Sequence, residues 1–204
     1  MKTAVLVRPN VIDVQDWPVP EPGRGEVLVR VRAVGICGSD THYFSGKRDH
    51  EKETVYPCVL GHEFAGEVAG LGQGVGDVRI GTRVYCEPER PCGRCEWCRK
   101  GEFNVCPNVR FAGSAGAPGC LCEYFVVPRE RLFPLADRVG FAEATLVEPL
   151  GISLHIVDRL VRPVGGETYA VVGAGPIGLV TIFAARQRGA SAIYASDEIA
   201  GRLE

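Results

Sequence analysis

Four cysteines lie within fifteen residues (92 to 106) in the pattern Cys92-x2-Cys95-x2-Cys98-x7-Cys106. Four thiolates at this spacing can close a tetrahedron around Zn²⁺ with no open position, so the segment is expected to fold as a structural metal lobe. An iron-sulfur cluster or four unrelated buried thiols are the alternatives. The chain has nine cysteines, an odd number for a disulfide scaffold, and in a reducing compartment such clustering favours a metal.

The apolar pattern changes character along the chain. Up to about residue 135 the apolar segments are short and rich in valine, such as 27–31 and 124–127, and glycine and proline turns separate them. This pattern is typical of strands in a partly open barrel. Over residues 141–160, leucines recur at helical spacing. We therefore expect one domain over residues 1–155, with the cysteine lobe at 86–110, and a second from 156 to 204.

The second domain carries a glycine-rich turn between an expected strand (169–172) and an expected helix (176–188), and a second strand (192–195) completes a βαβ unit. In a turn of the form G-x-G-x-x-G, backbone amides approach a pyrophosphate at the helix N-terminus. Asp197 follows the second strand, where an acid binds the ribose hydroxyls of NAD and repels the 2′-phosphate of NADP. The alternative is a turn of another α/β protein, with Asp197 as a surface charge. The expected cofactor contacts are Gly173, Gly175, Pro176, Ile177, Gly178 and Asp197.

A second set of possible metal ligands is dispersed: Cys37, the pair His62-Glu63, and Glu148. A thiolate, an imidazole and a carboxylate are the right classes for a zinc site that leaves a fourth position for water or substrate. Taken singly, a cysteine is most often a small buried hydrophobe, a histidine a hydrogen-bonded structural residue, and a glutamate a solvated charge. Spacing alone does not link these residues.

Together these motifs resemble the zinc-containing medium-chain dehydrogenases, in particular their sorbitol and xylitol dehydrogenase branch. The segment Gly61-His62-Glu63-x2-Gly66-x5-Gly72-x2-Val75 resembles the zinc signature of that family, and the four cysteines have its spacing. The resemblance covers the whole chain. It implies a mixed fold, with an N-terminal GroES-like β-barrel catalytic domain and the start of an α/β Rossmann domain. Family members continue well beyond this length, so the chain is expected to be C-terminally truncated.

The resemblance also implies roles for individual residues. Cys37 and His62 would bind the catalytic zinc, and Glu148 stands where other alcohol dehydrogenases of the family have a second cysteine. In the polyol branch Glu63 can bind the zinc directly while Glu148 holds the metal-bound water, so both carboxylates stay open as the third ligand. The segment that follows Cys37 matches the same branch. By this match, Ser39 and His42 would relay the proton, and Tyr43 would lie near the substrate.

The function implied is a zinc-dependent oxidoreductase, with two zinc ions per chain, that transfers a hydride from a secondary alcohol or polyol, such as sorbitol or xylitol, to NAD. The alternatives are a threonine, aldose or other alcohol dehydrogenase of the same family, or an inactive zinc-binding fragment. A zinc ribbon that grips nucleic acid would need a basic face, and the net charge of −2 argues against one.

The surroundings of the protein can be anticipated from the same sequence. No segment is long and apolar enough to span a bilayer, and the apolar start is cut short by Arg8 and Pro9, unlike a signal peptide. We expect a cytoplasmic protein that binds a small alcohol, has neither nucleic acid nor membrane as partner, and forms a homo-oligomer, a dimer or tetramer, at full length.

Overall fold

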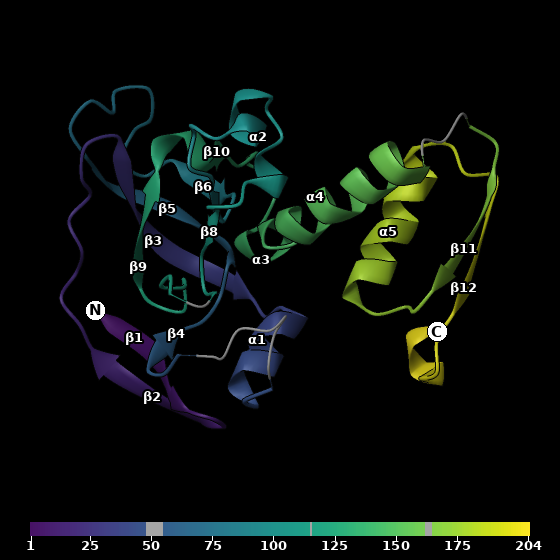
Figure 1. Cartoon of the computed structure of the whole chain (residues 1–204), viewed down its shortest axis with the longest axis horizontal. Coiled ribbons are helices and arrows are strands. Elements are labelled where there is room, and N and C mark those ends of the chain that lie inside the picture. The colour runs from purple at the N-terminus through teal and green to yellow at the C-terminus, as the bar shows by residue number, and fades with distance from the viewer. Residues whose placement is uncertain (48–54, 115, 162–164) are drawn as a thin grey trace. The chain divides into compact units, whose positions relative to one another are not determined.

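The computed structural model describes residues 1–47, 55–114, 116–161 and 165–204. The chain divides into two compact units, Met1–Thr145 and Leu146–Glu204. The first unit consists mainly of strands, and the second combines helices with a pair of strands (Figure 1). This division reflects how compactly each part of the chain packs. The boundary between the catalytic and nucleotide-binding domains, expected near residue 155, stays a prediction.

Two antiparallel sheets form most of the first unit. The larger sheet has the strand order β10-β6-β5-β3-β9, and the smaller has the order β2-β1-β4. The strands of the larger sheet are β3 (Glu26–Gly35), β5 (Glu63–Leu71), β6 (Arg83–Cys86), β9 (Tyr124–Pro128) and β10 (Leu132–Pro134). Those of the smaller sheet are β1 (Lys2–Arg8), β2 (Val11–Asp16) and β4 (Cys58–Val59).

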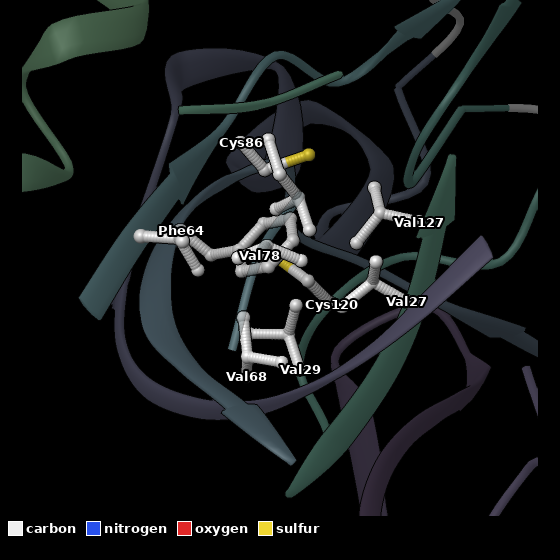
Figure 2. Close-up of a cluster of buried hydrophobic side chains, with 10 residues drawn as sticks. Val27, Val29, Phe64, Val68, Val78, Cys86, Cys120 and Val127 are labelled. Carbon is white, nitrogen blue, oxygen red and sulfur yellow. The ribbon is translucent and has the colours of Figure 1, made fainter. Parts of the chain in front are cut away.

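The core of the first unit is built from alternate residues of these strands. Val27 and Val29 of β3 are fully buried and meet Val68 of β5 and Val127 of β9 (Figure 2). Successive side chains of a strand point to opposite faces, so a valine at every second position supplies one apolar face. Burying such a side chain stabilises the fold by about 1.5–3 kcal/mol. The strands expected from the valine-rich segments are therefore confirmed.

Short elements lie around these sheets. The hairpin of β7 (Glu89–Arg90) and β8 (Arg110–Phe111) brackets the cysteine segment, which contains α2 (Glu96–Arg99) and a 3-10 turn, η1 (Phe103–Val105). The remaining elements of the first unit are α1 (Gly38–Phe44), η2 (Arg129–Arg131) and α3 (Phe141–Ala144).

The second unit contains the βαβ arrangement expected from the sequence. Strands β11 (Thr168–Val172) and β12 (Ala192–Ser196) pair in parallel, and α5 (Pro176–Gln187) connects them. Helix α4 (Val147–His155) continues as a π-helical turn, η3 (Ile156–Val161), and a 3-10 turn, η4 (Ala200–Arg202), lies near the end of the chain. The hydroxyl of Thr181 in α5 donates to Ser153 Oγ in α4 at 3.0 Å. Within the described part of the chain, no helix has both the length and the apolar character needed to cross a membrane.

Candidate metal centres and nucleotide-binding turn

The four clustered cysteines converge on one point in the lobe between β7 and β8. Their sulfur atoms all lie within 4.8 Å of one another. Cys92 Sγ lies 3.9 Å from Cys98 Sγ, and Cys95 Sγ lies 3.8 Å from Cys106 Sγ. A tetrahedral zinc site with Zn–S bonds of about 2.3 Å has S–S edges of about 3.8 Å. The spacing of the thiols therefore fits a closed zinc site.

The pKa values of these thiols also suit a bound zinc ion. Backbone N–H groups of Arg94 and Cys95 lower the pKa of Cys92 to about 6, so its thiolate forms near neutral pH. Burial and the hydrogen bonds to neighbouring thiols raise the pKa of Cys98 to about 12. Without a metal, one thiol is therefore ionised and another is neutral at the same pH. A divalent cation at the centre would stabilise the thiolate form of all four.

A second cluster forms where β3 ends and β5 begins. Cys37, His62 and Glu63 each offer a ligand atom, and these atoms lie within 4.8 Å of one another. The register of the sheet brings them together, because Gly35 pairs with Glu63. A Cβ atom on Gly35 would lie 2.3 Å from Glu63 Oε2, so a larger residue there would require the Glu63 carboxylate to move. Both His62 and Glu63 are buried.

Sequence reasoning did not assign a role to Asp40, which joins the two segments of this cluster. Its carboxylate is 3% exposed. Oδ2 accepts the backbone N–H of Cys37 at 3.0 Å, and Oδ1 accepts that of Gly61 at 3.0 Å. Oδ1 also lies 3.9 Å from His62 Nδ1. An acid three residues after a helix N-cap is a capping signal, and this signal could have drawn attention to Asp40.

Burial shifts the two acidic groups of the second cluster towards their neutral forms. Burial raises the pKa of Glu63 and that of the Cys37 thiol, although hydrogen bonds from Ser39 partly oppose the second shift. In a low-dielectric site both groups prefer their neutral forms, and a divalent cation between them would stabilise the charged forms. A thiolate, an imidazole and a carboxylate within reach of one point are a donor set that suits zinc.

The other residues that the sequence predicts for this site lie in α1 and in α4. Ser39 is half-buried beside Cys37, and His42 is exposed one turn later, on the same face of the helix. Tyr43 is half-buried, and its carbonyl accepts the hydroxyl of Tyr56 at 3.1 Å. Glu148 lies in the first turn of α4, in the second unit, so its role as a ligand stays a prediction.

The glycine-rich turn joins β11 to α5, whose first residue is Pro176. A Cβ atom on Gly178 would lie 1.8 Å from the carbonyl oxygen of Gly173, so the turn can close this tightly only with glycine there. Asp197 Oδ2 accepts the backbone N–H of Ala174 at 2.8 Å, and Oδ1 accepts that of Ile199 at 2.8 Å. These bonds lower the pKa of Asp197, so an anion lies beside the turn.

Comparison with known proteins agrees with this architecture. Residues 23–137 match the model of the alcohol dehydrogenase GroES-like domain. Over 205 residues the chain is 39% identical to sorbitol dehydrogenase of Bacillus subtilis (strain 168), a match that covers 100% of this chain and 58% of that protein. It is 38% identical over 202 residues to a probable D-xylulose reductase A of Aspergillus fumigatus (strain CBS 144.89 / FGSC A1163 / CEA10), covering 98% of this chain and 56% of that one.

A solved structure is also similar. The crystal structure of an alcohol dehydrogenase from Escherichia coli CFT073 in complex with its cofactor NADH superposes with a TM-score of 0.90 at 35% identity, covering 100% of this chain and 58% of that one. The chain thus spans less than two thirds of the length of the relatives it matches. The expected fold, a GroES-like domain followed by the beginning of a Rossmann domain, is confirmed. The chain belongs to the alcohol dehydrogenase GroES-like domain family, among the zinc-dependent medium-chain dehydrogenases.

Proposed function

We propose that this chain is the zinc-binding part of an oxidoreductase that transfers a hydride from a secondary alcohol or polyol, such as sorbitol or xylitol, to NAD. The observation that carries the proposal is the cluster of Cys37, His62 and Glu63, whose ligand atoms lie within 4.8 Å of one another. Relatives named sorbitol dehydrogenase and D-xylulose reductase support the substrate class.

We also propose two zinc ions per chain. The four thiols of the lobe would enclose one ion completely, and Cys37 and His62, together with Glu63 or Glu148, would hold the other with one position open. Zinc at the open centre supplies a Lewis acid that makes the substrate hydroxyl more acidic. His62 and Glu63 are buried, and electrostatic interactions are stronger in such less polar surroundings than in water.

The residues of α1 would carry the proton of the substrate hydroxyl to solvent. Ser39 lies beside Cys37, where its hydroxyl can accept the substrate proton, and His42 lies one helical turn further on at the exposed surface. An imidazole can exchange a proton with solvent near neutral pH. Tyr43, next in the same helix, would border the substrate. The backbone turn at Gly173–Gly178 would hold the pyrophosphate of the cofactor at the N-terminus of α5.

Oxidation of a panel of alcohols tests the substrate class. The zinc-loaded chain and a full-length version that includes the rest of the nucleotide-binding domain are offered sorbitol, xylitol, threonine, glucose and 2-propanol with NAD, and NADH formation is followed. The proposal requires the full-length enzyme to oxidise a polyol with the highest kcat/KM. A higher kcat/KM for threonine or glucose would assign the protein to another substrate class of the family. A zinc-loaded full-length protein inactive on every alcohol would contradict the proposed activity.

Asp40→Asn should weaken zinc binding at the open centre by about 10–100-fold, the usual effect of removing a group that orients metal ligands. The amide has a single acceptor oxygen, so it cannot accept the N–H groups of both Cys37 and Gly61 as the carboxylate does. Zinc affinity is measured by competition with a fluorescent chelator. Asp13→Asn, at an exposed position in β2, is the matched control. Equal affinities in Asp40→Asn and the unmodified protein would show that Asp40 does not position the ligands.

Asp197→Ala, combined with Glu198→Arg, should reverse the preference for NAD over NADP. The negative charge of Asp197 lies beside the glycine turn and would repel a 2′-phosphate, whereas an arginine would attract it. Calorimetric titration with both dinucleotides gives the ratio of their dissociation constants. Glu204→Ala, which removes a charge at the exposed chain end, is the control. If the double variant keeps the original ratio, Asp197 does not select the cofactor.

We further propose a cytoplasmic location and a homo-oligomer, a dimer or tetramer, for the full-length enzyme. None of the nine cysteines, all of which lie in the described part of the chain, forms a disulfide, as suits a reducing compartment. Cell fractionation and sedimentation velocity test these two points.

A further inference from the structure

The ring of Phe111, at the end of β8, packs against the imidazole of His62. The two ring centroids lie 5.0 Å apart and the ring planes meet at 62°, an edge-to-face arrangement. Such pairs attract each other because the positive edge of one ring lies against the negative face of the other. His62 belongs to the second cluster, the proposed open zinc centre, whereas Phe111 has no metal-binding atom. Through this contact Phe111 can influence the metal site without binding the metal.

The orientation of the His62 ring matters, because a ring nitrogen binds a metal along one direction in the plane of the ring. Metal-binding histidines usually gain this orientation from a hydrogen bond that the other ring nitrogen donates. Asp40 Oδ1 lies 3.9 Å from His62 Nδ1, which is longer than a hydrogen bond. Packing against Phe111 therefore supplies a constraint on the ring that this carboxylate does not.

Phe111 is itself held in place at the base of the cysteine lobe. It pairs with Glu89 in the hairpin of β7 and β8, which brackets the lobe. Its carbonyl accepts the backbone N–H of Ser114 at 3.2 Å and the hydroxyl of the same residue at 2.7 Å. The next residue, Ala112, donates its N–H to the carbonyl of Pro88 at 3.2 Å. The backbone that carries the Phe111 ring is thus fixed on both sides of the hairpin.

The segment that follows Phe111 also packs directly on the segment that carries His62. A Cβ atom on Gly113 would lie 2.7 Å from the carbonyl oxygen of Gly61, so a larger residue could not come this close without a shift of the backbone. The same carbonyl of Gly61 accepts the N–H of Cys120 at 2.9 Å. The rings of Phe111 and His62 therefore meet at a junction where both backbones are already held.

We propose that Phe111 is a positioning residue of the open centre. From the base of the cysteine lobe, its ring holds the imidazole of His62 in the orientation that binds zinc. Phe111 contributes no ligand atom, and it acts by reducing the number of directions in which the imidazole can point before the metal arrives. This inference rests on the proposed function, in which His62 binds a zinc ion.

Phe111→Leu tests the proposal in the whole chain. Leucine keeps an apolar side chain but has no aromatic ring, so zinc should bind about 2–10-fold more weakly at the open centre. The affinity is measured by competition with a fluorescent chelator while the lobe retains its zinc. Phe133→Leu is the matched control, because the Phe133 ring stacks on Tyr85 at 5.3 Å and neither residue belongs to a metal cluster. The control loses an aromatic pair of similar separation and should keep its zinc affinity.

Cobalt provides a spectroscopic measurement that a loss of packing elsewhere would not change. Co²⁺ is exchanged into the open centre while the lobe keeps its zinc, because a site with an open position releases its metal more readily than four enclosing thiolates do. The visible absorption of bound Co²⁺ depends on the geometry of its ligands. The absorption bands should therefore shift in Phe111→Leu and stay in place in Phe133→Leu.

The outcomes separate this inference from the proposed function. If the unmodified chain binds metal at both centres, but Phe111→Leu keeps either the zinc affinity or the cobalt bands of the unmodified protein, Phe111 does not position His62. The open centre would then stand without it. An unmodified chain that binds metal in the lobe alone would overturn the open centre, and this inference with it.

Discussion

His62→Ala should reduce the zinc content from two ions per chain to one and lower alcohol oxidation by the full-length enzyme at least about a thousandfold. Removing the imidazole leaves a thiol and a carboxylate at the open centre, and both have raised pKa values when no cation is bound. The lost Lewis acid is worth several kcal/mol of transition-state stabilisation, hence the size of the expected effect. Zinc is measured by mass spectrometry on protein purified without chelator, and turnover by NADH formation.

His155→Ala is the matched control for this variant. His155 is exposed in α4 and belongs to neither cluster, so two zinc ions and full stability are expected. The His62 variant should lose the packing of its buried ring but keep the stability that the lobe contributes, because the lobe retains all four thiolates. A His62→Ala protein that still holds two zinc ions would remove the open centre from the proposed mechanism.

Cys95→Ser should differ from His62→Ala, because its main effect should be a large loss of stability caused by opening the lobe. The sulfur of Cys95 lies 3.8 Å from that of Cys106 and accepts the backbone N–H of Cys98 at 3.4 Å. Without it the zinc tetrahedron is open, and the free energy of zinc binding no longer stabilises the fold. Loss of a structural metal is among the changes that cost about 4 kcal/mol or more, which lowers the unfolding temperature by roughly 8–16 °C at this size.

Cys58→Ser separates this effect from the general cost of losing a thiol. Cys58 is half-buried in β4 and lies outside both clusters, so a change within about 1 kcal/mol is expected. Strong chelation of the unmodified protein should lower its unfolding temperature as Cys95→Ser does. Equal losses of stability in Cys95→Ser and Cys58→Ser would mean that the lobe does not depend on a metal.

Features encoded by short stretches of sequence were predictable. The four lobe cysteines lie within fifteen residues (92 to 106), so their convergence needs only local turns. Alternating valines in β3 and the glycine turn before α5 are likewise local, and each strand or helix expected from them is present. For the valines the spacing already sets which face of the strand is apolar, because side-chain direction follows backbone period.

The open centre needed more than spacing. Cys37 and His62 are far apart in sequence, and their residue types alone did not link them; the resemblance to a family did. In the structure the link is the register of β3 against β5, which pairs Gly35 with Glu63. A shift of one residue would turn every side chain of β5 to the other face and separate these groups.

Sequence by itself determined where the lobe, the valine-rich strands and the βαβ turn lie along the chain, because each is encoded by a local pattern of residue types. Tertiary structure alone decided that Asp40 ties Cys37 to Gly61 and lies 3.9 Å from His62 Nδ1. The contacts with Gly61 and His62 depend on partners supplied by another segment of the chain. Those partners are fixed only when distant strands pair, and no local pattern records the pairing.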